Sequence, residues 1–354
     1  MDALEEIVEQ ARRDCPVCPS AASGCGKAPK ITIAGIGGAG CNALNELKGI
    51  ESATTLAINT DVANLRSIDA HKRLLLATDS TKGLGAGGFP EVGMKCAESN
   101  KEEIAKALEG THLLFLVAGL GGGTGTGAAP VVAEIAKEMG ATVVATVMYP
   151  FAIEKIRREK AEWGLDALFR SCDTVAVLDH NRLTQMVPTL SFGQAPFVLN
   201  NIVARAVRGI SDSITCQALV KLGIEDVRAV ATGGGLATIA LGQGSGSFKV
   251  EDAVKEMFKS PLLESSLKDA KGALVHITGG QAVSMAEIQK AGERIRKEFA
   301  PKTAVAIGAH TDSRMMDKMV ITAIATGVKS PKIKPRETFS DAEKEKIAME
   351  IAAG

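Results

Sequence analysis

The apolar residues alternate between two kinds of segment from Lys30 onwards. Short apolar runs, typical of buried strands, are separated by longer segments in which apolar residues recur every three or four positions, as on helices that cover a sheet. The strands predicted in this part of the chain are KITIAG, TTLAINTD, RLLLAT, LLFLVAG, TVVATVMY and TVAVLD. Strands that alternate with helices in this way indicate a parallel sheet covered on both faces.

Helices are predicted between these strands. One begins at about Cys41, and the others cover EVGMKCAESNKEEIAKALEG, PVVAEIAKEMG and EKAEWGLDALFRS. Pro130 falls in the first turn of the helix PVVAEIAKEMG, where proline is tolerated because the N–H that it lacks would have no partner.

The alternation stops after Asp179, and apolar residues at every fourth position then predict one long helix over residues 197–216. Beyond it, the predicted strands are VRAVAT, LATIALG, GALVHITG, TAVAIGAHT and KMVITAIATG, with helices at VEDAVKEMFKS and MAEIQKAGERIRKEF. The last two strands have no helix between them, which indicates a smaller domain with a mixed sheet.

The predicted fold class is therefore α/β, with a Rossmann-like parallel-sheet domain, a long central helix and a smaller α+β domain whose sheet is mixed. At 354 residues with 45% hydrophobic content, the chain can bury the cores of about two domains. The predicted segments are an N-terminal helix with a cysteine-containing linker, the parallel-sheet domain, the central helix, the C-terminal domain and a polar tail, over residues 1–29, 30–196, 197–216, 217–329 and 330–354.

The charge balance argues against broad classes of partner. Lys plus Arg and Asp plus Glu both number 41, so the formal net charge is zero and no general attraction to nucleic acid or anionic lipid is expected. No apolar stretch approaches the ~20 residues of a membrane span, and MDALEEIVEQARRD lacks the basic and apolar regions of a signal peptide. These features predict a cytoplasmic protein that does not insert into a membrane.

Three cysteines in the linker, Cys15, Cys18 and Cys25, form a C-x-x-C pair with a third thiol nearby. This pattern is typical of zinc and redox sites. A fourth ligand is missing and no histidine lies near, so reduced thiols without a metal are the preferred interpretation, and no metal-ligating residue is predicted.

The first glycine loop, GIGGAG at Gly35–Gly40, follows a predicted strand and precedes a predicted helix. With Asp61 about twenty residues further on, it matches the G-x-G-x-x-G pattern of dinucleotide-binding proteins. Glycines let the backbone approach a phosphate, which the N–H groups at the start of the helix then bind. On its own this loop is compatible with an NAD-binding oxidoreductase or with a purely structural turn.

Two further glycine loops change this interpretation. The second glycine loop, GGGTGTG at Gly121–Gly127, follows the fourth strand, and the third, GLGAGG at Gly83–Gly88, follows the third strand. Three such loops at the carboxyl ends of neighbouring parallel strands converge on one crevice and suit a triphosphate better than a pyrophosphate. The chain contains no G-x-x-x-x-G-K-[ST], so backbone N–H groups, the hydroxyls of Thr124 and Thr126 and a metal ion are expected to meet the phosphate charge. An NAD-binding oxidoreductase would leave the second loop without a role.

The motifs GIGGAGCNAL, AINTD, GLGAGGFPEVG, VAGLGGGTGTGAAP and MVITAIATGV occur in an order that resembles the tubulin/FtsZ superfamily, and most of all the archaeal FtsZ cell-division GTPases. The resemblance covers roughly residues 30–330. It implies a GTP-binding domain joined by the long helix to a smaller activation domain, with GTP or GDP and Mg²⁺ as ligands. It also implies a head-to-tail filament of identical subunits at the division site, with a membrane adaptor or other division proteins as partners.

The resemblance assigns nucleotide contacts to the glycine loops and to the segment after the fifth strand. Glu154 matches a carboxylate that binds ribose, and Arg157 or Arg158 matches an arginine close to it. The residues that match the contacts of the loops are Gly37, Gly38, Asn42, Ala86, Gly87, Gly122, Gly123, Thr124 and Gly125.

Recognition of the base departs from the family pattern. His180 stands where the family has asparagine, and a ligand role for it is as compatible with the sequence as a position on the loop surface. The ring that stacks on guanine corresponds to Pro196 or Phe197. Asn200 or Asn201 takes the position of the side chain that pairs with the guanine edge, where an amide can both donate and accept.

The catalytic loop departs from the family pattern as well. In the family, a loop of the form Asn-x-Asp-x-x-Asp from the neighbouring subunit completes the site, and here it is KLGIED (Lys221–Asp226, the junction loop). In one interpretation Asp226, partly assisted by Glu225, positions the attacking water while Lys221 approaches the neighbour's phosphates. In the other, both acids are ordinary solvated residues and hydrolysis is slow, which suits a paralogue that regulates filaments.

Overall fold

The computed structural model describes residues 29–78, 81–191, 193–215, 218–280 and 282–333. The predicted N-terminal helix, the three linker cysteines and most of the polar tail lie outside these ranges. The strands within them are β1 (Ile31–Ile36), β2 (Thr54–Asn59), β3 (Lys72–Leu75), β4 (Leu113–Gly119), β5 (Thr142–Tyr149), β6 (Thr174–Asp179), β7 (Gly235–Ser245), β8 (Gly272–Gly279), β9 (Ala304–Thr311) and β10 (Lys318–Thr326). The helices are α2 (Gly37–Asn45), α3 (Val62–Arg66), α4 (Pro90–Ser99), α5 (Lys101–Leu108), α6 (Thr124–Glu138), α7 (Lys155–Ser171), α8 (His180–Met186), α9 (Ala195–Thr215), α10 (Ile224–Ala231), α11 (Lys249–Lys259) and α12 (Met285–Glu298).

The strands form one sheet in the order β3-β2-β1-β4-β5-β6-β7-β10-β8-β9. All neighbours from β3 to β7 pair in parallel, β10 pairs antiparallel with both β7 and β8, and β9 adds to β8 in parallel. The predicted α/β class, with a parallel part and a mixed C-terminal part, is confirmed. The two parts are directly joined, because residues 174–176 of β6 pair with residues 235–237 of β7.

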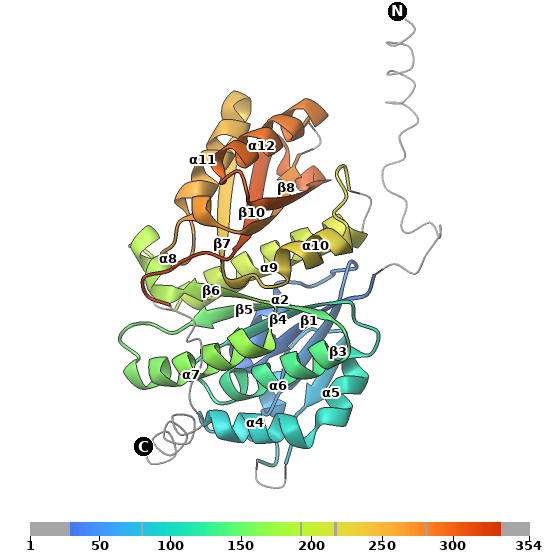
Figure 1. Ribbon diagram of the computed structural model, residues 1–354. Helices are drawn as coiled ribbons and strands as arrows, with labels where there is room; N and C mark the ends of the chain where they lie inside the picture. The colour runs from blue at the N-terminus through green and yellow to red at the C-terminus, as the bar shows by residue number, and fades with distance from the viewer. Residues whose placement is uncertain (1–28, 79–80, 192, 216–217, 281, 334–354) are drawn as a thin grey trace, which may run out of the picture.

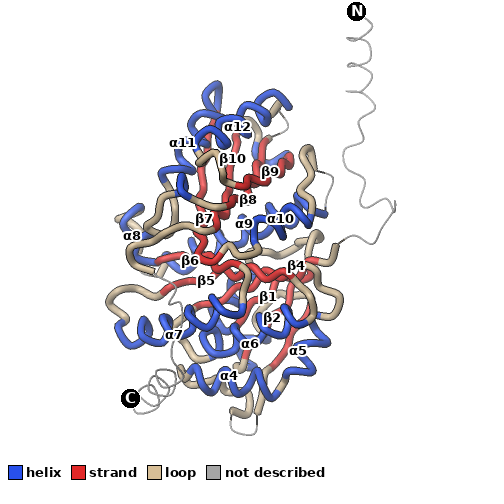
Figure 2. Tube along the Cα trace, in the orientation of Figure 1, coloured by secondary structure: helices blue, strands red, loops and turns tan. Residues whose placement is uncertain are grey.

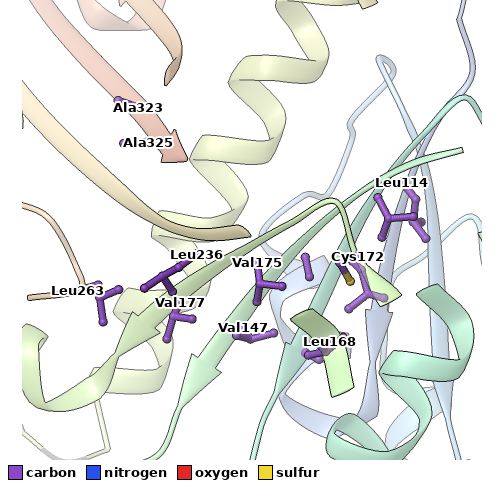
Figure 3. Packing of buried hydrophobic residues seen from close by; sticks show 14 of the residues in the cluster. Leu114, Val147, Leu168, Cys172, Val175, Val177, Leu236, Leu263, Ala323 and Ala325 are labelled. Carbon is purple, nitrogen blue, oxygen red and sulfur yellow. The ribbon is translucent and has the colours of Figure 1, made fainter. Parts of the chain in front are cut away.

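Helices cover both faces of the parallel part of the sheet (Figure 1). One apolar cluster joins the sheet to α4–α7 and to α11 and α12, and a second joins the opposite face to α2, α9 and α10. Figure 2 shows the same layers, with α9 passing between the two parts of the molecule. In Figure 3, Leu168 of α7 lies near Val147 of the sheet, and Val177 of β6 and Leu236 of β7 continue the same cluster toward the C-terminal part.

Two helices begin earlier than the sequence pattern predicts, inside their glycine loops. α2 begins at Gly37 rather than at about Cys41, and α6 begins at Thr124, so Pro130 lies inside the helix rather than in its first turn. Glycine is a poor helix former, but here its missing side chain permits close packing, since a Cβ at Gly127 would overlap a carbonyl oxygen of α4. Tertiary packing therefore overrides local propensity and places helix N–H groups inside the loops.

Three other element predictions are wrong or incomplete. The predicted strand VRAVAT belongs to α10, where its buried apolar residues follow helical spacing. The single helix predicted over residues 91–110 is two helices, and Asn100 between them turns its Nδ2 to the carbonyl oxygen of Cys96 at 2.7 Å. The sequence pattern did not predict α8, whose first turn is capped by Asp179 through a 2.8 Å hydrogen bond from the N–H of Asn181.

Candidate nucleotide-binding site

A cavity of about 430 Å³ lies at the carboxyl ends of β1, β4, β5 and β6, next to the first turns of α2, α6 and α9. A larger cleft of about 750 Å³ lies between α9 and the C-terminal strands, and its walls contain none of the glycine loops. The smaller cavity is the candidate site, because it brings together residues that the sequence singled out in widely separated segments. Its walls are formed by Gly37, Gly38, Ala39, Asn42, Gly119, Leu120, Gly122, Gly123, Thr124, Gly125, Met148, Pro150, Phe151, Glu154, Arg157, His180, Pro196 and Asn200.

The first turns of α2 and α6 both begin at the cavity wall. The N-cap residues are Ile36 for α2 and Gly123 for α6. Neither residue caps its helix through a side-chain hydrogen bond, so the first N–H groups of both helices lack a capping side chain. Gly38 and Gly122 have no atom within 4 Å of the place where a Cβ would stand, so each loop is open on this side. The N–H groups at a helix start and the positive end of the helix dipole attract anions, and two such helix starts together suit a chain of phosphates.

The second glycine loop is held in shape by threonine hydroxyls. Thr124 and Thr60 share a hydrogen bond of 2.6 Å, and the N–H of Gly121 donates to Oγ1 of Thr126 at 2.8 Å. Thr126 is fully buried and does not line the cavity, so the expectation that its hydroxyl meets a phosphate does not fit this structure. Thr124 lines the cavity and stays a candidate for that contact.

The third glycine loop lies beside the second without forming part of the cavity wall. A Cβ at Gly123 would stand 2.7 Å from Cβ of Ala86, so the two loops are in close contact. Gly87 has φ +59°, a backbone conformation that favours glycine. Neither Ala86 nor Gly87 is among the wall residues, and their contact with the outermost phosphate stays a prediction.

Glu154 and Arg157 face the cavity as a pair. Nη1 of Arg157 lies 2.9 Å from Oε1 of Glu154, whose other oxygen accepts from the N–H of Phe151 at 3.1 Å. Arg158 lies instead with its guanidinium carbon 5.7 Å from the ring centroid of Tyr149. Of the two arginines that the sequence offered, Arg157 is therefore the one at the cavity wall.

His180 is buried in the cavity wall at the end of β6. Its Nδ1 donates to the carbonyl oxygen of Tyr149 at 2.6 Å, and its ring centroid lies 4.7 Å from that of Phe151. Burial lowers the pKa of His180 below its usual value, although the hydrogen bond to Tyr149 and the carboxylates of Asp179 and Glu154 oppose the shift. The imidazole is thus neutral at neutral pH. The sequence did not single out Phe151, whose only signal is its place directly after the fifth strand and Pro150.

The first turns of α9 contribute the last part of the wall. Pro196 and Asn200 line the cavity, whereas Phe197 is 59% exposed and Asn201 lines the larger cleft. Oδ1 of Asn200 is buried and has no hydrogen-bond partner among the residues that the structure describes. A buried acceptor without a partner is costly unless a ligand satisfies it, so the wall fits a group that carries N–H donors, as guanine does.

Comparison with known proteins decides the family. The family described as "Tubulin/FtsZ family, GTPase domain" matches residues 30–188, and "FtsZ family, C-terminal domain" matches residues 235–329. The cell division protein FtsZ 2 of Methanocaldococcus jannaschii is 45% identical over 87% of this chain and 83% of its own length. The chain belongs to the tubulin/FtsZ family.

Further FtsZ proteins support this membership. The cell division protein FtsZ 1 of Archaeoglobus fulgidus is 43% identical over 87% of this chain and 85% of its own length. The solved structure of an empty FtsZ dimer from M. jannaschii matches with a TM-score of 0.82 at 34% identity, and covers 96% of this chain and 99% of that one. Membership of this GTPase family implies that the chain binds guanine nucleotide. The match to the GTPase domain includes every residue of the cavity wall except Pro196 and Asn200.

The junction loop of this FtsZ-family chain lies away from the cavity. α9 begins at the cavity wall, and at about 1.5 Å per residue its 21 residues extend for about 31 Å before the loop begins. In Figure 1, α8 lies at the left of the molecule and α10 at the right. Lys221, Glu225 and Asp226 are all exposed, and none of them lines the cavity of its own subunit.

The contacts of the junction loop are local. Oδ2 of Asp226 accepts from the N–H of Gly223 at 3.1 Å, and Oε1 of Glu225 lies 3.1 Å from Nη1 of Arg228. Asp226 therefore helps to begin α10, and Arg228 partly balances the charge of Glu225.

Two further properties concern the described residues only. They contain no group of three or more His, Cys, Asp or Glu side chains that could hold a metal ion. No helix among them is long and apolar enough to cross a membrane.

Proposed function

We propose that this chain is a GTP-binding, self-polymerising cytoskeletal protein of FtsZ type that acts in cell division and hydrolyses GTP at the junctions between subunits. The observation that carries the proposal is the placement of the cavity and the junction loop at opposite ends of α9. A site whose parts are divided in this way can be completed only by a second molecule.

The cavity wall offers a partner for each part of GTP. The phosphates bind the N–H groups at the starts of α2 and α6, and Ala86 and Gly87 approach the outermost phosphate. Glu154 and Arg157 bind the ribose and the neighbouring phosphate, and Asn200 pairs with the base. When bound, Mg²⁺ supplies positive charge that neutralises the phosphates, with the Thr124 hydroxyl as the ligand that this chain offers.

Hydrolysis takes place where the junction loop of one subunit covers the nucleotide of the next. The carboxylate of Asp226 positions the attacking water, with Glu225 and Lys221 beside it. A head-to-tail contact of this kind is heterologous and does not close, so it generates a filament. Ile153 and Ile156, on either side of Glu154 in the sequence, are 79% and 71% exposed, and they offer apolar surface for such a contact beside the cavity.

The junction loop also supports a second candidate, a weakly hydrolysing or non-hydrolysing FtsZ paralogue that regulates filaments. Gly223 stands where the family pattern has an acid, so the loop brings fewer carboxylates to the junction. A Cβ at Gly223 would lie 2.8 Å from Oδ2 of Asp226, so the present arrangement leaves no room for a second side chain unless that carboxylate moves. Membership of a GTPase family argues against an NAD-binding oxidoreductase.

The partners that follow from this function are other copies of the chain, together with a membrane adaptor or other division proteins. The place of action is the cytoplasm at the division site. The zero net charge permits self-association, because identical subunits repel one another weakly.

Light scattering and phosphate release, measured on the same samples over a range of protein concentrations, test the proposal. With GTP, scattering should rise above a threshold concentration, and phosphate release per subunit should rise at the same threshold. GDP should support neither. Phosphate release without scattering would contradict hydrolysis at junctions, and scattering without release would favour the regulatory paralogue.

A further inference from the structure

The contacts of His180 leave its imidazole only one neutral form. Nδ1 must carry the hydrogen, because its partner at 2.6 Å is the carbonyl oxygen of Tyr149, which can only accept. In the neutral ring, Nε2 is then an acceptor without a hydrogen. No hydrogen bond from a described residue reaches Nε2, and the ring, which packs against Phe151, lines the cavity.

Asn200 offers a different kind of polar group to the same cavity. Its side-chain amide has both donors and an acceptor, and a half-turn about the last torsion exchanges them. Guanine presents O6, an acceptor, next to N1–H, a donor, and one amide can pair with both. The 2-amino group beyond N1 presents only N–H, so it needs an acceptor.

From this complementarity we infer that Nε2 of His180 accepts a hydrogen bond from the 2-amino group of guanine and sets the preference of the site for guanine over hypoxanthine and xanthine. The inference rests on the proposed GTP function. Asn200 pairs with O6 and N1–H in the same arrangement. An amide at position 180 can turn and donate to a carbonyl group at position 2 of the base, but His180 cannot, since its only N–H is held by Tyr149.

The expected discrimination follows from what each base presents to Nε2. Hypoxanthine lacks the 2-amino group and leaves this acceptor without a partner, so IDP should bind roughly tenfold more weakly than GDP. Xanthine has a carbonyl group at position 2 and brings two acceptors together, so XDP should bind more weakly than IDP.

Competition titrations of the full chain with GDP, IDP and XDP test the inference. His180→Phe keeps a ring against Phe151 but removes the acceptor, so the preference for GDP over IDP should fall to about onefold while IDP affinity changes by less than about threefold. His180→Asn restores an amide and should raise XDP affinity relative to GDP. His310→Phe is the matched control, because His310 lines the larger cleft, and it should leave all the ratios unchanged.

Three results would overturn the inference. They are equal binding of GDP and IDP by the unmodified chain, equal weakening of all three nucleotides in His180→Phe, and a protonated Nε2 in the ¹⁵N spectrum of the unmodified chain at neutral pH. The spectrum needs no variant to fold, and His180→Phe identifies the signal. Failure of the proposed function would look different, because the chain would then bind ADP as well as GDP, or neither.

Discussion

Gly122 shows, at the scale of a single residue, how a missing side chain leaves space in the proposed binding site. It lies in the cavity wall, and nothing stands within 4 Å of the place where its Cβ would be. A Cβ at this position would meet no protein atom within 4 Å, and a longer side chain would enter the space proposed for the phosphates. A substitution at Gly122 should therefore affect nucleotide binding without affecting folding.

Gly122→Leu is therefore expected to fold and to bind GDP about 100-fold more weakly or worse, a loss of at least about 2.7 kcal/mol. Gly193→Leu is the matched control, because Gly193 also has nothing within 4 Å of its Cβ position and lies outside the cavity wall. Titration with GDP measures the affinities, and circular dichroism checks the fold. Unchanged affinity in folded Gly122→Leu would contradict the assignment of the second glycine loop.

At this scale, the sequence could not predict which of two adjacent residues faces the cavity. Arg157 and Arg158, like Asn200 and Asn201, were alternatives because adjacent residues on a helix differ by about 100° in direction. The rotation of α7 and α9 about their axes decides which member of each pair faces the cavity. That rotation depends on long-range packing, which no short motif records.

At the scale of elements, His276 joins β8 to α9. Its ring nitrogens lie 2.7 Å from Oγ of Ser213 in α9 and 2.8 Å from Oγ1 of Thr278 in β8. Burial lowers the pKa of His276 from 6.5 to about 3. Between these two values the unfolded chain binds a proton that the folded chain does not, so acid favours unfolding.

The free energy of unfolding should accordingly fall as pH drops below 6.5 toward 3, with His276 contributing up to about 1.4 kcal/mol per pH unit. Above pH 6.5 this residue should add no pH dependence. Denaturant unfolding at pH 7 and pH 5 measures the effect. His276→Gln should lose less stability over this interval than the unmodified chain, and an equal loss in both proteins would show that His276 is not the titrating group.

Asp226 has a structural role at the start of α10 that can be measured independently of its proposed role in hydrolysis. Asp226→Ala removes the acceptor for the N–H of Gly223 and should lower the free energy of unfolding by about 1 kcal/mol. Asp226→Asn keeps an oxygen acceptor and should lower it by less. Denaturant unfolding of the two variants measures the difference, and equal stability of both would show that the hydrogen bond contributes nothing.

Strands and helix ends differ in how far the sequence predicts them. The strands of the parallel part were predictable because buried parallel strands are continuous apolar runs. The starts of α2 and α6 were not, because their glycines have low helix propensity and the helices are favoured by close packing with neighbouring segments. The segment VRAVAT was assigned to a strand, since a short apolar run alone does not distinguish a strand from a buried helix.

At the scale of the whole molecule, one sheet and one long helix set the distance between the cavity and the junction loop, the two parts of the proposed catalytic site. The cavity lies where the parallel strands end, and the first turns of α9 line it. From there α9 extends across the molecule toward α10 (Figure 1). Of the three glycine motifs, the first two contribute residues to the cavity wall, whereas the third lies outside it. The place of Phe151 in the cavity wall and the neutral form of His180 were not predictable. Both depend on contacts between segments that are distant in sequence, and no motif specifies those contacts.

The central claim is that two subunits share one catalytic site, and GTP turnover in mixtures of two variants tests it most directly. Asp226→Asn keeps the cavity and should bind GTP, but its turnover should fall at least about tenfold. Gly122→Leu keeps Asp226 and should show no turnover alone. In a mixture, the junction loop of Gly122→Leu can cover the nucleotide of Asp226→Asn, so turnover should rise well above the sum of the two variants measured separately. Turnover no greater than that sum, with full activity of the unmodified chain persisting far below the concentration at which it assembles, would contradict the shared site.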